Sequence, residues 1–127
     1  MNHQVTPASI APPAANYAHA VLSDAPARLL HTAGVVPVRP DGSVPDDLEE
    51  QAEVIWVNVG AILSAAEMEP ADIVSITTYV VAGEPLGPVM AARDQFMDGS
   101  LAASTLVTVP TLARPEWRVE IAVVAAR

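Results

Sequence analysis

Residues 46–81, DDLEEQAEVIWVNVGAILSAAEMEPADIVSITTYVV, decide the fold, because a helical pattern is followed at once by a strand pattern. Apolar side chains over 46–66 recur with the 3.6-residue period of an amphipathic helix, and Asp46 or Asp47 supplies an N-cap. Dense β-branched residues over 73–81 then predict a strand. The predicted apolar face of the helix consists of Leu48, Ala52, Ile55, Trp56, Val59, Ile62, Leu63 and Ala66.

The strand over 73–81 has two different faces. Strict alternation places Val74, Ile76 and Val80 on one of them. The other face is mixed, and it carries Ile73, Ser75, Thr77, Tyr79 and Val81. A half-polar face of this kind is consistent with an interior at a subunit interface.

The flanking segments complete an alternating pattern. Short strands are predicted over 20–22 and 28–33, a second helix between Gly83 and Gly99, and closing strands over 106–109 and 119–124. The order β-β-α-β-α-β-β indicates one α/β domain over 1–127. Its prolines make residues 1–16 an extended arm. Two helices would cover one face of the sheet, which leaves the other exposed unless copies of the chain cover it.

The composition excludes several classes of function. Hydrophobic residues make up 51% of the 127 residues, and 15 acidic against 6 basic residues give a net charge of −9. The basic residues are all arginine, so binding to nucleic acid or to an anionic membrane is not expected. Three histidines and no cysteine argue against a metal site and against disulfides, and no glycine-rich loop could hold a nucleotide cofactor. No apolar run approaches the ~20 residues of a membrane helix, and the N-terminus has no leader pattern. We expect a cytoplasmic protein without a cofactor.

Few residues carry chemistry. Glu120 interrupts the apolar stretch 119–124, and burying a carboxylate there costs free energy unless it is paired or protonated. It either points to solvent or pairs with an arginine such as Arg118, or it is a general acid/base or water-orienting group. His19 could act as a base or be merely hydrogen-bonded. The hydroxyl of Tyr17 could point into a cleft or be structural.

Several segments, taken in order, resemble the RidA family of reactive-intermediate deaminases, also called YjgF or L-PSP proteins. Residues 12–21, PPAANYAHAV, are similar to the family's Pro-x-x-x-Gly-Pro-Tyr-Ser-Gln-Ala-Val opening. Residues 31–37, HTAGVVP, are similar to its Thr-Ser-Gly-Gln-x-Pro turn, and 119–121 to its closing Val-Glu-Ile strand. Residues 73–81 match its central strand, so the resemblance covers about residues 10–125.

The resemblance implies a chorismate-mutase-like α/β fold and a homotrimer whose sheets face one another, with small-molecule clefts at the subunit interfaces. It also implies hydrolysis of enamines and imines, such as 2-aminoacrylate, to a keto acid and ammonia, without metal or cofactor. In such a cleft Tyr17 would shape the wall, and Glu120 would position the attacking water.

The sequence differs from the family at the positions that bind the substrate in that family. The arginine of a Pro-Ala-Arg segment grips the substrate carboxylate in the family, and Ala103 stands at that position. The turn glutamine is Val35, the asparagine of the second helix is Met90, and the serine and glutamine of the opening are Ala18 and His19. These changes predict a more apolar cleft and poor turnover of carboxylated imines.

Two functions therefore stay open: a divergent hydrolase of the enamine/imine deaminase class, or a non-catalytic trimer that binds a small ligand or a partner protein. The catalytic candidates are Glu120 and Tyr17. Arg93 or Arg114 could replace the missing anion clamp. The negative charge argues against the ribonuclease activity that L-PSP names carry. The substrate-binding candidates are Gly34, Val35, His19, Met90, Ala103 and Ser104.

Overall fold

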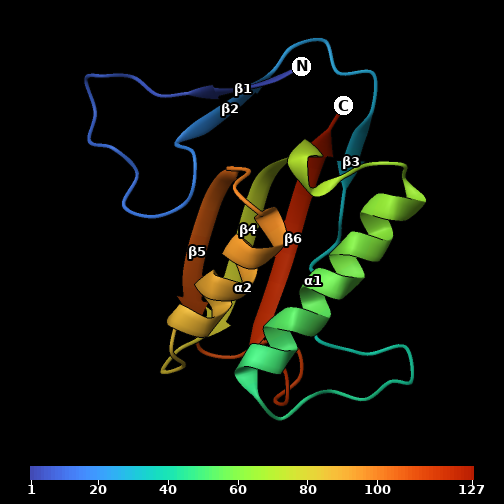
Figure 1. Ribbon diagram of the computed structural model, residues 1–127. Helices are drawn as coiled ribbons and strands as arrows, with labels where there is room; N and C mark the ends of the chain where they lie inside the picture. The colour runs from blue at the N-terminus through green and yellow to red at the C-terminus, as the bar shows by residue number, and fades with distance from the viewer.

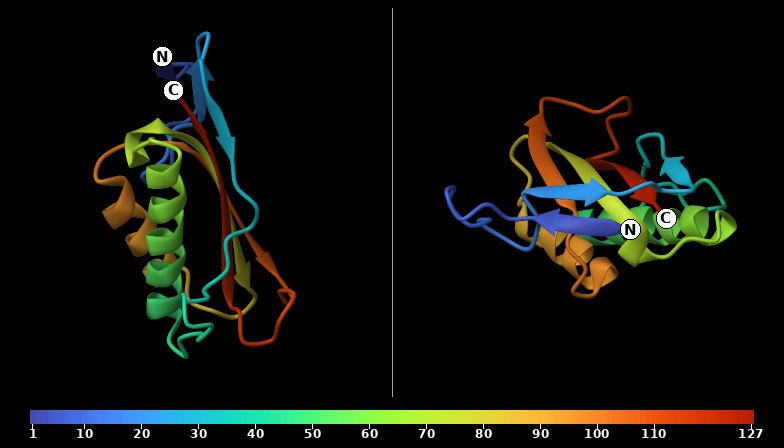
Figure 2. Two further views of the ribbon diagram at one scale, coloured as in Figure 1. Left: turned by 90° about the vertical axis from the view of Figure 1, so that its right-hand side faces the viewer. Right: turned by 90° about the horizontal axis from the view of Figure 1, so that it is seen from above.

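Two helices cover one face of a four-stranded mixed sheet in the computed structural model, which describes residues 1–127 (Figures 1 and 2). The strand order is β3-β6-β4-β5, with β4 and β5 parallel and the other pairs antiparallel. This arrangement confirms the predicted α/β class with both helices on one side. The elements are α1 (Leu48–Ala65), α2 (Gly87–Met97), β3 (Leu29–His31), β4 (Ile73–Val81), β5 (Ala103–Val109) and β6 (Val119–Ala126).

The N-terminal arm is extended, as predicted, but its first residues form a strand. β1 (Asn2–Val5) pairs antiparallel with β2 (Ala20–Ser23), and together they make a separate two-stranded sheet at one end of the molecule (Figure 1). The side-chain amide of Asn2 donates a 2.8 Å hydrogen bond to the carbonyl of Ala126. The predicted element order therefore lacked one strand, because proline content alone does not show what an extended segment pairs with.

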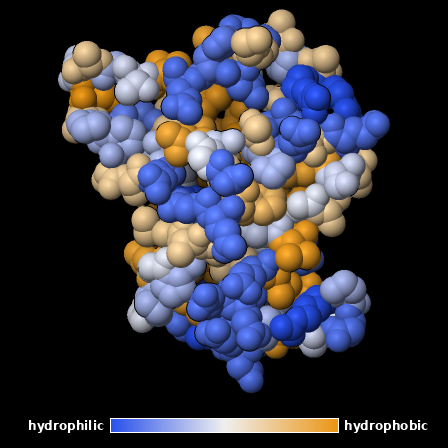
Figure 3. Space-filling model, viewed as in Figure 1, coloured by the Kyte–Doolittle hydropathy of each residue, from blue (hydrophilic) through white to orange (hydrophobic).

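The core lies between the helices and the sheet. The predicted apolar face of α1 is confirmed at six positions, while Ile62 and Ala66 are only half-buried. Trp56 of α1 stacks on Phe96 of α2 with ring centroids 4.7 Å apart, which joins the two helices. Figure 3 shows blue hydrophilic side chains spread over much of the outer, helix-bearing side, with apolar groups between them. The six confirmed positions are Leu48, Ala52, Ile55, Trp56, Val59 and Leu63.

The faces of β4 differ from the prediction at the start of the strand. The register of β4 against β6 shifts between Ile73 and Ser75. This irregularity turns Ile73 into the core, where it is 3% exposed. Strict alternation had placed Ile73 on the mixed face, and that prediction was wrong because a bulge breaks the two-residue period.

The sheet face away from the helices carries a mixture of small, polar and apolar residues in three rows across β5, β4 and β6. The pairing registers define these rows, whose members share one face. We call this surface the open face. Its rows are Ala103–Ser75–Val124, Thr105–Thr77–Ala122 and Val107–Tyr79–Glu120.

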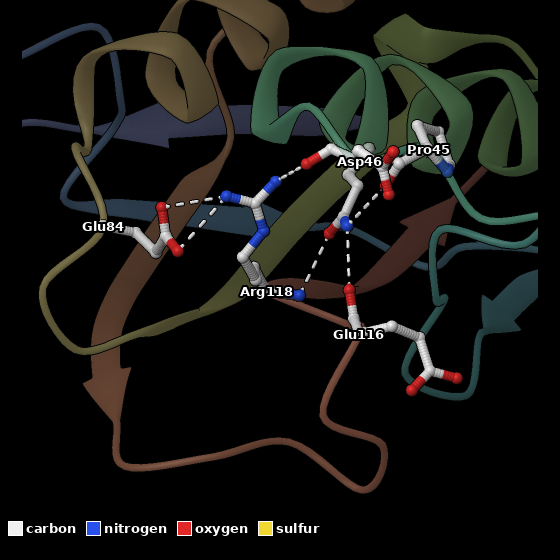
Figure 4. A network of polar contacts seen from close by, with 6 residues as sticks. Pro45, Asp46, Glu84, Glu116 and Arg118 are labelled. Atoms are coloured by element: carbon white, nitrogen blue, oxygen red, sulfur yellow. Dashed lines mark hydrogen bonds and ion pairs between the residues drawn. The ribbon is translucent and has the colours of Figure 1, made fainter.

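A buried glutamine holds two loops against the start of α1 (Figure 4). Gln51 is 1% exposed, and its amide nitrogen donates 2.8 Å hydrogen bonds to the carbonyls of Pro45 and Glu116. Its amide oxygen accepts from the backbone N–H of Arg118 at 3.0 Å. The Arg118 side chain donates to the carboxylate of Glu84 and to the carbonyl of Asp46, so both loops meet at this point.

We predict that Gln51→Leu lowers the free energy of unfolding by about 2–4 kcal/mol, because it leaves buried backbone groups without partners. Urea denaturation followed by circular dichroism measures this loss. Gln95→Leu, at an exposed position of α2, is the matched control and should change stability little. Equal stability of the two variants would contradict the role assigned to Gln51.

Candidate functional site

A cavity of about 240 Å³ lies between α2, β5 and the N-terminal arm. It is smaller than the pockets of roughly 300–1,000 Å³ that take drug-sized ligands, so it suits a small molecule. Its wall is mainly apolar, with three polar side chains. The lining residues are Ala15, Tyr17, Leu86, Met90, Arg93, Ser104 and Leu106.

The arm places Tyr17 over the start of β5. The N–H of Ala18 donates to the carbonyl of Ala102 at 2.9 Å, and Ala18 forms a parallel bridge with Ala103. The Tyr17 hydroxyl accepts a 3.2 Å hydrogen bond from the N–H of Ala14. Its own O–H has no acceptor in the chain and remains available to a ligand.

His19 lies beside this cavity but does not line it. It is exposed, and its Nε2 is 2.7 Å from the carbonyl of Ala11. Its ring meets the Tyr17 ring edge-on, with centroids 5.9 Å apart. This geometry matches the hydrogen-bonded alternative for His19, which contacts the Tyr17 ring outside the cavity.

Of the two arginines considered as a replacement clamp, Arg93 lines the cavity and Arg114 does not. Arg114 lies in the loop between β5 and β6, with its guanidinium 5.6 Å from the centroid of the Trp117 ring. Arg93 comes from α2, where Val89, Arg93 and Met97 form the buried stripe. A spacing of four residues puts all three on one helix face, and this is the sequence signal that locates Arg93 at the sheet.

A second group of predicted site residues gathers at the other side of the sheet. Glu120 is half-buried on the open face, and its carboxylate has no hydrogen-bond or ion-pair partner in the chain. Arg118 pairs with Glu84, so the predicted alternative of an Arg118–Glu120 pair is wrong. A Cβ added at Gly34 would lie 2.0 Å from Oε2 of Glu120, so the carboxylate rests directly on the glycine. Val35 exchanges backbone hydrogen bonds with Ile121 at 2.7 and 3.1 Å, which holds Gly34 in place.

The two groups are separate within one chain. Ser104 and Leu106 of the cavity alternate along β5 with the open-face residues Thr105 and Val107, so they point to the helix side of the sheet. Glu120 lies in the open-face row of Val107 and Tyr79, on the opposite side of the sheet. The structure therefore brings Tyr17, Met90 and Ser104 together with Arg93, and Gly34 with Val35 and Glu120, but it does not unite the two sets.

The remaining electrostatic features lie elsewhere. Hydrogen bonds from the side chain and then the backbone of Ser43 hold the pKa of Asp41 below its usual value, in the exposed loop before α1. No three histidine or acidic side chains are grouped as metal ligands would be. Neither helix has the length and apolarity that crossing a bilayer requires.

Known proteins resemble this chain in sequence and in structure over most of its length. The 2-iminobutanoate/2-iminopropanoate deaminase of Escherichia coli is 32% identical over 103 residues, which cover 78% of this chain and 80% of that protein. The Rid-family protein YyfB of Yersinia pestis, whose function is unknown, superimposes with a TM-score of 0.89 at 31% identity, covering 99% of this chain and 98% of the other. Escherichia coli TdcF with bound serine gives a TM-score of 0.73 at 26% identity, over 93% of this chain and 90% of the other.

The sequence model of the family described as Endoribonuclease L-PSP matches residues 8–127. The match extends from the arm that carries Tyr17 to the end of β6 and so includes both groups of site residues. The chain therefore belongs to the Endoribonuclease L-PSP family, the RidA family of reactive-intermediate deaminases.

Proposed function

We propose that the protein hydrolyses the C=N bond of small imines, and of enamines after their conversion to imines, in a cleft formed between copies of the chain. The observation that carries the proposal is the carboxylate of Glu120, half-buried and without a partner in the chain. A carboxylate that makes no contact holding this chain together has no evident structural role, so a functional role accounts for it better. The deaminase named among its relatives supports the same reaction class.

The chemistry balances with water as the only co-reactant. An enamine gains a proton at its β-carbon and loses one from nitrogen, and so becomes an imine. Water then adds to the imine carbon while one of its protons passes to nitrogen, which gives a carbinolamine. The hydroxyl proton of the carbinolamine passes to nitrogen as the C–N bond breaks, and the products are a carbonyl compound and ammonia. Glu120 accepts a hydrogen bond from the attacking water and aligns it, and the free O–H of Tyr17 donates to the substrate.

One copy of the chain does not bring Glu120 to the Tyr17 cavity, and a second copy would. In one chain Glu120 and the Tyr17 cavity lie on opposite sides of the sheet, and the open face that carries Glu120 is not covered by either helix (Figure 2). We propose a homotrimer in which the open faces meet, so that Glu120 of one copy approaches the cavity of the next. The central row of small residues, Thr105, Thr77 and Ala122, lets the sheets come close.

The deciding experiment generates imines in place with an oxidase and follows formation of the carbonyl product. An amino-acid oxidase supplies carboxylated imines, and an amine oxidase supplies uncharged ones. Because imines also hydrolyse spontaneously, each rate is compared with a reaction that lacks the protein. We expect the protein to accelerate at least one class. No acceleration of either class would favour the non-catalytic alternative, which the missing arginine at Ala103 and the missing glutamine at Val35 support.

We predict that Gly34→Ala slows hydrolysis by roughly 10- to 100-fold with little change in melting temperature. The added methyl group must displace the flexible end of Glu120, and a shift of about 1 Å in a catalytic group can cost 100-fold in rate. Gly87→Ala is the matched control, because nothing lies within 4 Å of the methyl group it adds. A Gly34→Ala enzyme as active as the Gly87→Ala enzyme would show that the position of Glu120 does not matter.

A further inference from the structure

Arg93 is a buried cation in a position where a helix normally presents an apolar side chain. Its side chain is 8% exposed, whereas the paired arginines Arg118, Arg39 and Arg127 keep 28%, 40% and 55% of theirs exposed. It lies between the buried residues Val89 and Met97 on α2. Burying a guanidinium is costly unless its charge and its donors are satisfied.

The hydrogen bonds of Arg93 leave two of its N–H donors without an acceptor. Nε and Nη2 donate to Oδ1 of Asp94 at 3.1 and 3.0 Å, and Nη1 donates to Oγ of Ser104 at a long 3.4 Å. These three contacts use three of the five N–H groups of a guanidinium. One N–H on each terminal nitrogen therefore has no acceptor in the chain. Free N–H groups on both terminal nitrogens are the donors that a carboxylate accepts from an arginine.

The partner carboxylate holds Arg93 from outside the cavity. Asp94 does not line the cavity with Tyr17, and its second oxygen accepts a 3.0 Å hydrogen bond from the side-chain amide of Asn16 on the arm. Asp94 and Asn16 instead line a neighbouring depression. The Asp94 contact thus fixes the guanidinium in one orientation, while Arg93 and Ser104 contribute to the cavity wall.

We propose that Arg93 is the anion-binding group of this cavity, and that the cavity takes a small carboxylate whose apolar part lies against Leu86, Met90 and Leu106. The positive charge is supplied by Arg93 on α2. It does not come from position 103, where Ala103 points to the open face. The proposal rests on the proposed function for the identity of the cleft, and what it adds is the residue that selects carboxylated over uncharged imines, Arg93. It replaces the expectation of poor turnover of carboxylated imines, which rested on the apolar residues at several positions of the cleft and on the loss of the arginine at Ala103.

The test compares two non-reacting probes of similar size, 2-oxobutanoate and uncharged butanone, by NMR titration of the purified protein. We expect the wild type to bind 2-oxobutanoate at least about tenfold more tightly, and the side-chain Nε–H signal of Arg93 to shift on binding. Arg93→Met should weaken 2-oxobutanoate binding by roughly 10- to 100-fold and leave butanone binding nearly unchanged. Arg114→Met, which removes an exposed arginine outside the cavity, is the matched control and should retain the preference.

A purely structural Arg93 gives a different result. Loss of stability in Arg93→Met without loss of the carboxylate preference would overturn the proposal, as would a wild type that binds both probes equally. Should Arg93→Met fail to fold, Arg93→Lys keeps the charge without the planar fork and should show an intermediate preference, and an unmoved Arg93 signal in the wild type would be decisive against the proposal. Because neither probe is turned over, absence of imine hydrolysis together with an intact preference would refute only the proposed function.

Discussion

Replacing Glu120 with glutamine is expected to reduce kcat/KM for imine hydrolysis by about 100-fold or more, since a positioned acid/base group contributes roughly 10²–10⁴ to the rate. Glutamine has the size and shape of glutamate, so it keeps the packing on Gly34. It removes the negative charge and the ability to accept a proton from water. The variant therefore separates the chemistry of this side chain from its contribution to the fold.

Steady-state hydrolysis of oxidase-generated imines measures the effect, with thermal denaturation as the check on folding. Glu116→Gln is the matched control, because the Glu116 carboxylate is exposed and points away from the network drawn in Figure 4, in which only the backbone carbonyl of Glu116 takes part. The control should match the wild type. A Glu120→Gln enzyme that also matches it would remove Glu120 from the mechanism and would favour a water activated by another group.

The elements that the sequence predicts best are those whose pattern is local. The helix expected over 46–66 is α1, and the strand expected over 73–81 is β4 with the same ends. In both cases periodic burial of apolar side chains decides the structure, and the period is visible in the sequence. The family resemblance adds the topology of the sheet, which no local pattern contains, and the comparisons confirm it.

Features that depend on distant partners could not be predicted in this way. Pairing of β1 with β2 joins residues more than a dozen positions apart, and the bulge that turns Ile73 inward is set by its register on β6. Gln51 is a polar residue on the apolar face of α1, and its burial makes sense only with the carbonyls of Pro45 and Glu116 beside it. These hydrogen bonds form only in the folded chain, so the sequence of α1 by itself does not indicate them.

The candidate site residues also divide into those predicted from local sequence and those whose place depends on distant parts of the chain. Tyr17, Gly34 and Glu120 are candidates because of the motifs that surround them, and their roles stay predictions. The structure places Tyr17 in a cavity wall and rests the Glu120 carboxylate on Gly34. Arg93 was considered but could not be placed, because its neighbours in the cavity come from the arm and from β5. The separation of the two groups of site residues became evident only from the strand registers.

Val107→Asp is expected to convert the proposed trimer into single 13.2 kDa chains and to abolish the proposed hydrolysis. Val107 is 40% exposed, and it lies on the open face in the same row as Tyr79 and Glu120. In the proposed trimer this row faces another copy. The new carboxylate would lose water on assembly without gaining a partner, and it would add to the charge of Glu120 in a chain that already carries −9. Light scattering coupled to gel filtration measures the mass.

Val57→Asp makes the same substitution on the other side of the molecule. Val57 is 71% exposed on α1, whose outer surface takes no part in the proposed assembly, so this variant should keep both its mass and its activity. Circular dichroism separates a folded monomer from an unfolded chain in each case. A Val107→Asp protein that stays trimeric would place the subunit contact elsewhere. A folded Val107→Asp monomer with full activity would show that one chain holds a complete site, in which case Glu120 could not act on a substrate in the Tyr17 cavity, since the two lie on opposite sides of the sheet.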